Sequence, residues 1–247
     1  MLYWLSWAPA FEARAIMATI LYNLQVVRSR ISEAARAVGR DPAKICLVAV
    51  SKSWPTEVVR KAALAGQKKF GENYIQEAVE KITALSDLAL EWHFIGPVQG
   101  NKTRLVAHYF SWVHSVDRLR IAQRLAEARG ADRPPLQLCL QVNISGERSK
   151  AGVIPSEVAP LAVAVRRLPH VRLRGLMAIP EATDDVALLR RRYREVRYLK
   201  DSLAADGIEL DTLSMGMSHD LETAVAAGAT IVRVGTAIFG ARGKADR

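Results

Sequence analysis

The sequence has little of what marks several large classes of protein. Its 247 residues include only two cysteines, Cys46 and Cys139, and both lie within apolar runs. This pattern disfavours a disulfide framework and indicates small buried side chains in a reducing compartment. No apolar stretch reaches the roughly 20 residues of a membrane-spanning helix. The first residues also lack the basic start and cleavage site of a signal peptide. We therefore expect a cytoplasmic protein without a membrane partner.

The sequence also lacks the motifs of nucleic-acid-binding proteins, although its formal net charge is +10. There is no zinc-finger spacing and no aromatic RNA-binding motif. The one basic cluster, 190–194 with Arg197, spreads around more than one face of a predicted helix, which is typical of a solvated surface. Two interpretations of the charge stay open. It indicates either a nucleic-acid partner, for which charge is the only argument, or an electrostatic funnel for an anionic small molecule.

Half of the residues are hydrophobic, and strand-like and helix-like segments alternate along the chain. Strands are predicted near 44–51, 67–71, 91–95, 111–115, 136–143, 171–178, 209–214 and 230–235. Helices are predicted over 18–39, 56–65, 74–86, 101–108, 117–129, 155–167, 184–206 and 218–227. This pattern predicts a single (β/α)8 barrel of TIM type with an extra N-terminal helix over residues 17–247, and residues 1–16 are expected to be a disordered extension. A doubly wound sheet is the alternative, although no G-x-G-x-x-G follows the first strand.

Lys52 follows the apolar run 45–50, which is typical of a strand buried on both faces. The carboxyl ends of barrel strands carry the chemistry in such folds. A lysine that is partly desolvated there becomes a usable amine nucleophile, suited to a Schiff base with an aldehyde cofactor. By position alone, a solvated lysine just past a strand end is the more frequent outcome.

The last two strands predict a phosphate site, because barrels of this type commonly bind phosphate at the loops after strands seven and eight. The first of these loops contains Ser214, Gly216 and Ser218, with Ser218 as the expected N-cap of the next helix. The second contains Gly235 and Thr236. Together, the two loops favour a phosphate monoester.

Several other strand residues are candidates for the site. Alternation along the last strand places Arg233 opposite its two valine neighbours, so it is expected to point into the barrel. A buried guanidinium needs a partner, either a carboxylate of the barrel or the ring nitrogen of a heteroaromatic cofactor. Asn143 is predicted to hydrogen-bond a ring substituent and Met177 to form an apolar wall. We expect Glu72 to pair with a lysine or to close the barrel mouth, and His93 to be a hydrogen-bonded core or rim histidine.

Taken together, these motifs resemble the pyridoxal 5′-phosphate homeostasis protein family, the YggS-like proteins. The resemblance covers about residues 18–242 and rests on AVSK (49–52), FGENY (70–74), WHFIG (92–96), NK (101–102), RGLMAI (174–179), LSMGMS (213–218) and VRVGTAIFG (232–240). It implies a barrel similar to the amino-terminal domain of alanine racemase. Pyridoxal 5′-phosphate (PLP) would be held as a Schiff base on Lys52, with Arg233 facing the pyridine nitrogen. The other residues of the implied site are Ser214, Ser218, Gly235 and Thr236 around the phosphate, and Asn143 and Met177 beside the ring.

An arginine at the pyridine nitrogen keeps that atom unprotonated, which makes the ring a poor electron sink. Racemisation also needs an acid and a base on opposite faces of the cofactor, and Lys52 can serve one face. In alanine racemase-like enzymes, the other face is served by a tyrosine from a second domain and a second subunit, for which no room is expected after Arg247. We therefore expect a monomer that buffers PLP and delivers it to apo-enzymes without efficient amino-acid turnover. A racemase of the alanine racemase type is the alternative. Lys102 is expected either to accept the aldehyde in transit or to be a surface lysine.

Overall fold

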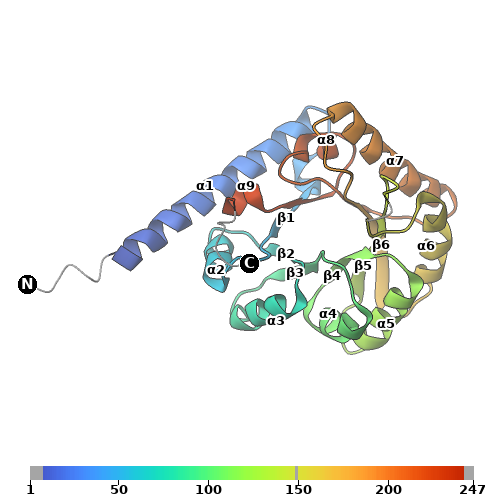
Figure 1. Cartoon of the computed structure of the whole chain (residues 1–247), viewed down its shortest axis with the longest axis horizontal. Helices are drawn as coiled ribbons and strands as arrows, with labels where there is room; N and C mark the ends of the chain where they lie inside the picture. Colours follow the sequence, from blue (N-terminus) through green and yellow to red (C-terminus); the bar gives the residue numbers. More distant parts are fainter. Residues whose placement is uncertain (1–7, 148–149, 242–247) are drawn as a thin grey trace, which may run out of the picture.

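The computed structural model describes residues 8–147 and 150–241, which form a closed barrel of eight parallel strands (Figure 1). Neighbouring strands follow one another in chain order, and β1 pairs with β8 to close the barrel. The strands are β1 (Cys46–Val50), β2 (Lys69–Glu72), β3 (Glu91–Phe94), β4 (Trp112–Val116), β5 (Leu136–Val142), β6 (Val171–Ala178), β7 (Thr212–Ser214) and β8 (Ile231–Val234). The predicted barrel is thus confirmed and the doubly wound alternative is wrong, because an open sheet has no pairing between its first and last strands.

Helices form a ring outside the strands, one after each strand (Figure 1). They are α2 (Thr56–Leu64), α3 (Ile75–Ala84), α4 (Thr103–Tyr109), α5 (Leu119–Arg129), α6 (Val158–Arg166), α7 (Val186–Ala205), α8 (Leu221–Ala226) and α9 (Thr236–Phe239). Three short 3₁₀ helices accompany them: η1 (Pro42–Lys44), η2 (Gly100–Lys102) and η3 (Pro155–Glu157). None of the described helices combines the length and the apolar character needed to cross a bilayer.

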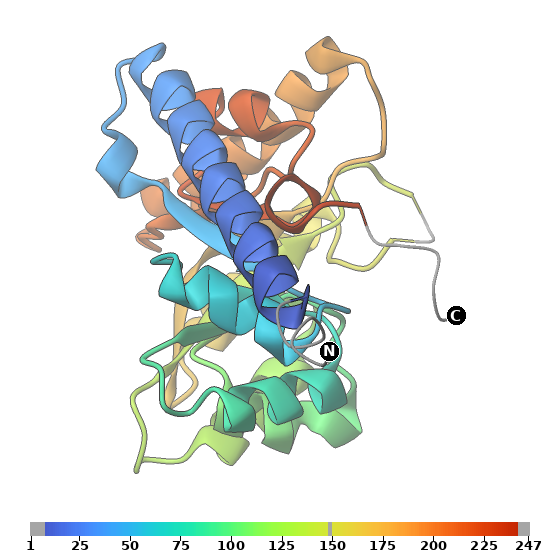
Figure 2. The same ribbon diagram turned by 90° about the vertical axis from the view of Figure 1, so that its left-hand side faces the viewer.

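The long helix α1 (Ala8–Arg36) lies along the side of the barrel, in contact with α8 and α9 (Figure 2). Its buried stripe includes Leu24 and Val27, which is the amphipathic pattern that predicted a helix over 18–39. The side-chain amide of Asn23 donates to the carbonyl of Ile238 at 2.9 Å, which fixes α1 to α9. The helix begins ten residues earlier than expected. Of the expected disordered extension 1–16, residues 8–16 belong to α1, and residues 1–7 lie outside the described residues.

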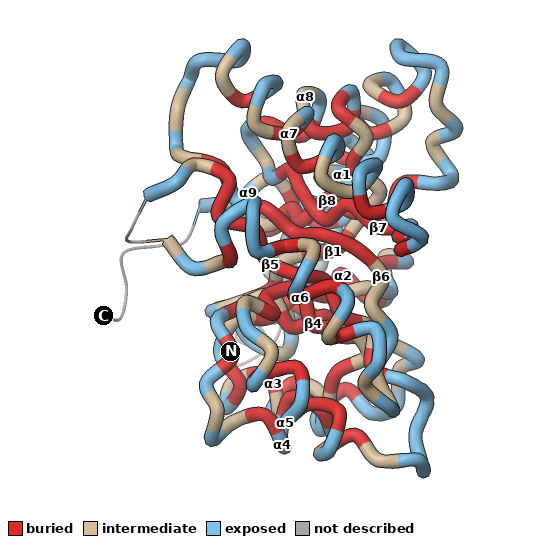
Figure 3. Tube along the Cα trace, turned by 90° about the vertical axis from the view of Figure 1, so that its right-hand side faces the viewer, coloured by how far each residue is buried: buried red, intermediate tan, exposed pale blue. Residues whose placement is uncertain are grey.

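Two layers of buried side chains surround the strands. Apolar residues pack between strands and helices, as Val232 and Val234 do on the outer face of β8. Figure 3 shows the trace of β8 coloured as buried. The inner layer usually consists of branched aliphatic side chains in such barrels. Here it also contains several buried polar groups, among them His93, His114 and Arg233. The barrel interior is therefore a polar site as well as a core.

Candidate functional site

Lys52 lies at the carboxyl end of β1 and is half-buried. Val48 is the register partner of Arg233 on β8, and register partners on parallel strands face the same side of a sheet. Alternation from Val48 through Val50 places Lys52 on this inner face. The lysine and Arg233 therefore belong to adjacent strands and to the same side of the barrel wall.

The residues on either side of Lys52 are fixed by a buried charge cluster, which we call the Lys81 cluster: Ser51, Glu72, Glu77 and Lys81. The ammonium group of Lys81 donates to the Ser51 carbonyl at 2.7 Å, to Glu72 at 2.9 Å and to Glu77 at 2.5 Å. The Ser51 hydroxyl donates to Glu72 at 2.6 Å. The backbone N–H of Ser53 donates to Glu77 at 2.6 Å.

This cluster confirms the expected pairing of Glu72 with a lysine. Burial raises the pKa of the Glu72 carboxyl, and Lys81 and Ser51 oppose that rise. Ser53 has a φ of 63°, a left-handed conformation that costs free energy unless its surroundings hold it. The hydrogen bond to Glu77 supplies that restraint, so the turn carrying Lys52 has a defined shape.

Arg233 is 3% exposed and points into the barrel, as alternation predicted. Its guanidinium donates to the Ser214 hydroxyl at 2.5 Å and to the Ala178 carbonyl at 3.0 Å. Within the described residues it makes no ion pair, so the first of the two predicted partners, a carboxylate of the barrel, is not found. Burial lowers the pKa of Arg233, while the negative charge of Asp220 raises it. A buried cation with neutral acceptors only is suited to an electron-rich ligand atom such as a pyridine nitrogen.

Ser214 was expected at the phosphate, but its hydroxyl is bonded inside the barrel instead. It is fully buried, and its hydroxyl bonds to Arg233 and to the His114 ring at 2.7 Å. Because both contacts lie inside the barrel, Ser214 supports Arg233. His93 is likewise a buried histidine with two hydrogen bonds, as expected.

The loops after β7 and β8 come together as predicted for a phosphate site. The Ser218 hydroxyl accepts a hydrogen bond from the backbone N–H of Ala237 at 3.3 Å, which joins the two loops. Thr236 is exposed, and Ser218 and Gly235 are partly exposed, so a ligand can reach all three. Gly216 has a φ of +95°, and a Cβ there would lie 2.5 Å from that of Ala224. Only glycine fits this close turn.

The predicted N-cap at Ser218 is wrong, because α8 begins at Leu221. Asp220 holds the preceding turn instead. One of its carboxylate oxygens accepts from the Met217 N–H at 2.6 Å and the other from the Tyr193 hydroxyl at 2.5 Å. His219 in this turn is exposed. The turn leaves the Ser218 hydroxyl to face the second loop.

Asn143 and Met177 lie at the same end of the barrel. The Asn143 amide donates to the carbonyls of Glu147 at 2.8 Å and Lys150 at 3.2 Å, and its oxygen accepts from the Gly146 N–H at 3.1 Å. Its contact with a cofactor ring stays a prediction. Met177 is fully buried in register with Ser214.

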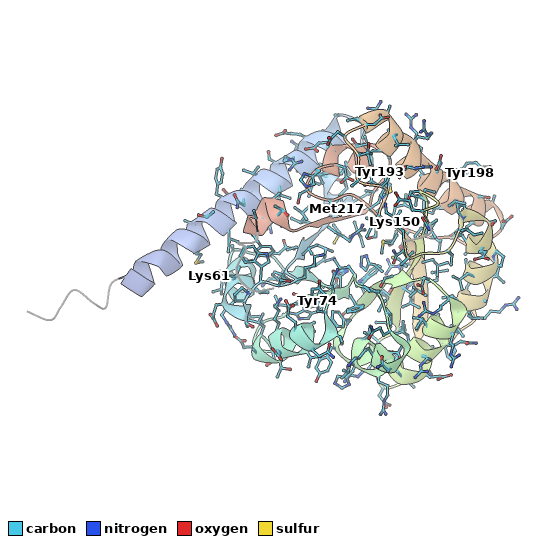
Figure 4. All side chains as sticks on the ribbon, in the orientation of Figure 1. Lys61, Tyr74, Lys150, Tyr193, Tyr198 and Met217 are labelled. Carbon is cyan, nitrogen blue, oxygen red and sulfur yellow. The ribbon has the colours of Figure 1, made fainter. Side chains whose placement is uncertain are left out.

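Three buried polar atoms at or just after the ends of β2 and β5 also lack a protein partner. Glu72 Oε2, Asn73 Oδ1 and Ser145 Oγ are buried and have no hydrogen bond. Lys150 and Met217 line a hollow beside this end of the barrel. In Figure 4 both residues lie over the barrel. The residues present thus fit a polar ligand with an electron-rich ring and an anionic group. No group of three histidine, cysteine, aspartate or glutamate residues that could bind a metal ion occurs in 8–147 or 150–241.

Sequence reasoning missed four residues of this region: Glu91, His114, Tyr193 and Asp220. Alternation in β3 and β4 places Glu91, His93 and His114 on the inner face. The sequence pattern therefore indicated Glu91 and His114. Tyr193 and Asp220 meet across 27 residues of chain, which no local pattern indicates.

Comparison with known proteins bears on these expectations. The family described as alanine racemase, N-terminal domain, matches residues 22–243. A Pseudomonas aeruginosa protein named pyridoxal phosphate homeostasis protein is 58% identical over 226 residues, covering 92% of this chain and 97% of that protein. The structure of PipY from Synechococcus elongatus with PLP bound is 37% identical with a TM-score of 0.76, covering 87% of this chain and 100% of PipY. An alanine racemase from Clostridium difficile has a TM-score of 0.74 at 15% identity, covering 93% of this chain and 58% of that enzyme. This last likeness shows the fold alone.

Proposed function

Since this chain belongs to the pyridoxal phosphate homeostasis proteins within the alanine racemase N-terminal domain family, we propose that it binds PLP at the carboxyl end of its barrel. The observation that carries the proposal is Arg233, a buried cation on the strand next to Lys52 that makes no ion pair among the described residues. The PLP-bound structure of PipY and the names of the curated relatives support the same ligand.

Each part of the site has one task in this proposal. PLP supplies an aldehyde that forms a Schiff base with a lysine amine. Lys52 provides that amine, and the Lys81 cluster fixes the backbone on both sides of it. Ser218, Gly235 and Thr236 bind the phosphate. Arg233 donates a hydrogen bond to the pyridine nitrogen.

The role of the protein is to store and deliver the cofactor. Arg233 donates a hydrogen bond but keeps its proton at neutral pH. It therefore leaves the pyridine nitrogen unprotonated and gives little support to carbanion chemistry. Lys52 is only half-buried, which lets another amine reach the Schiff base and take over the cofactor. We therefore propose reversible release to apo-enzymes without efficient turnover of amino acids.

An absorbance spectrum tests the binding proposal. The wild type and a Lys102→Ala control are expected to gain a band near the visible edge when PLP is added, and borohydride should remove it. Lys52→Ala should lack the band. A wild type that takes up no PLP would contradict the proposal. Loss of the band in Lys102→Ala alone would move the Schiff base to that residue. Steady turnover of a chiral amino acid that requires Lys52 would instead support a racemase.

A further inference from the structure

A continuous chain of hydrogen bonds crosses the barrel interior beneath Arg233. We call it the relay, and it consists of Ser214, His114, His93 and Glu91. Ser214 Oγ lies 2.7 Å from His114 Nδ1, and His114 Nε2 lies 2.9 Å from His93 Nδ1. His93 Nε2 lies 2.9 Å from Glu91 Oε1. The relay thus joins the carboxyl end of the barrel, where Arg233 lies, to Glu91 at the amino end of β3.

The relay has only one consistent direction. The hydrogen bond from His93 holds the pKa of Glu91 at about 2, so this carboxylate accepts and His93 carries its proton on Nε2. Burial lowers the pKa of both imidazoles, so each holds one ring proton. His93 Nδ1 must then accept from His114 Nε2–H, and His114 Nδ1 must accept from the Ser214 hydroxyl. The lone pairs of Ser214 are left for Arg233, which can only donate.

Both ends of the relay are charged, and their signs are opposite. Arg233 is a cation whose two nearest acceptors are neutral. Glu91 is an anion that also pairs with Lys69 at 3.4 Å. Hydrogen bonds in a chain polarise one another inside a low-dielectric core. Each bond therefore passes some of the carboxylate's negative potential towards Ser214, which makes its oxygen a better acceptor for the guanidinium.

Packing prevents the relay from rearranging. The His93 ring stacks on Trp112 with a centroid distance of 5.5 Å and an interplanar angle of 11°. The Arg174 guanidinium covers the Trp112 ring at 5.0 Å. A ring flip of His93 would break two hydrogen bonds in a fully buried place, so the orientation of this ring is fixed.

We propose that Glu91, His93, His114 and Ser214 are positioning residues for Arg233, and that Glu91 is the charged end of the relay that orients it. The relay holds the guanidinium so that its free donor edge faces the ligand ring. The expected effect of the relay on cofactor binding rests on the proposed PLP site. The direction of its hydrogen bonds is a property of the protein alone. Cofactor binding at one end of the barrel then depends on a charge at the other end.

Nitrogen NMR of the ligand-free wild type, labelled with ¹⁵N-histidine, tests the direction. Two neutral imidazoles are expected, both protonated at Nε2 and unchanged between about pH 5 and 8, the range in which free histidine titrates. A proton on Nδ1 of either ring, or titration of either ring in this range, would overturn the relay. Because no PLP is needed, this result stands even if the proposed function fails.

Titration of Glu91→Gln and Ser214→Ala with PLP tests the consequence. The glutamine keeps an acceptor for His93 but removes the charge. We therefore expect about tenfold weaker PLP binding, the loss typical when a residue that orients a metal ligand is changed, and a shifted absorption maximum. Asp87→Asn is the matched control, since Asp87 precedes β3 and loses only a surface ion pair with Arg60. Unchanged affinity and spectrum in both test variants, or equal changes in the control, would refute the inference. Failure of the wild type to bind PLP would refute the proposed function instead.

Discussion

Replacing Lys81 by methionine should cost the protein a large part of its stability. Lys81 is 3% exposed and forms the centre of the Lys81 cluster, where its ammonium contacts three oxygen atoms. Methionine fills a similar volume, so the change removes the charge and leaves little cavity. The carboxylate of Glu72, which is fully buried, would then have only the Ser51 hydroxyl as a partner.

Breaking a buried ion pair in this way typically costs about 3–5 kcal/mol, because one charge stays buried without compensation. The free energy of unfolding of a natural domain is about 5–15 kcal/mol in total, so Lys81→Met should lower the urea midpoint strongly. The exposed Lys44→Met is the control. The cost should shrink as pH falls, because a carboxyl whose folded pKa is raised binds protons more tightly when folded.

Adding Glu72→Gln to Lys81→Met should restore part of the loss, since the double variant no longer buries a lone charge. The readout is the urea midpoint at several pH values. The slope of the unfolding free energy against urea concentration is compared among the variants. A cost below about 1 kcal/mol, the value of an exposed pair, would refute the view that Glu72 is charged and dependent on Lys81. A cost that does not change with pH would refute the charge explanation and leave packing as the cause.

Three further predictions concern other parts of the site. Gly216→Ala should destabilise the protein by at least about 1–3 kcal/mol, because its φ of +95° and the nearby Ala224 exclude a Cβ; thermal unfolding measures this, and an unchanged melting temperature would contradict it. Tyr193→Phe should cost about 1–3 kcal/mol by leaving Asp220 without its buried donor, and a neutral result in urea would show that water replaces the hydroxyl. Glu91 has a folded pKa of about 2, below its ordinary pKa of 4.5, so it stabilises the folded protein fully above pH 4.5 and loses this effect as the pH falls towards 2. In an acid titration, the difference in unfolding free energy between wild type and Glu91→Gln should therefore vanish between these two pH values.

The fold was readable from the sequence because its signals are local. Strand-like segments such as the apolar run of β1 alternate with helical patterns, and all eight predicted strands overlap those of the structure. The position of Lys52 and the inward side of Arg233 followed from strand ends and alternation. The four-residue helix α9 escaped prediction because it is too short to show a helical period.

The errors at the site have a common physical cause, which is competition from distant partners. Ser218 has a sequence typical of an N-cap, but Asp220 is held by Tyr193 from α7 and takes over the turn. Ser214 lies in the expected phosphate loop, yet His114 captures its hydroxyl from 100 residues away. No local pattern reports such a choice between partners.

The closure of the barrel by β1 and β8 has a consequence for the order in which the molecule is made. The strand before Lys52 is synthesised long before β8, the strand that carries Arg233. Val48 and Arg233 are register partners across 185 residues of chain, and α1 packs on α8 and α9 in the same way. A nascent chain that lacks β8 therefore has the lysine without the arginine, and the two can meet only after β8 has been synthesised.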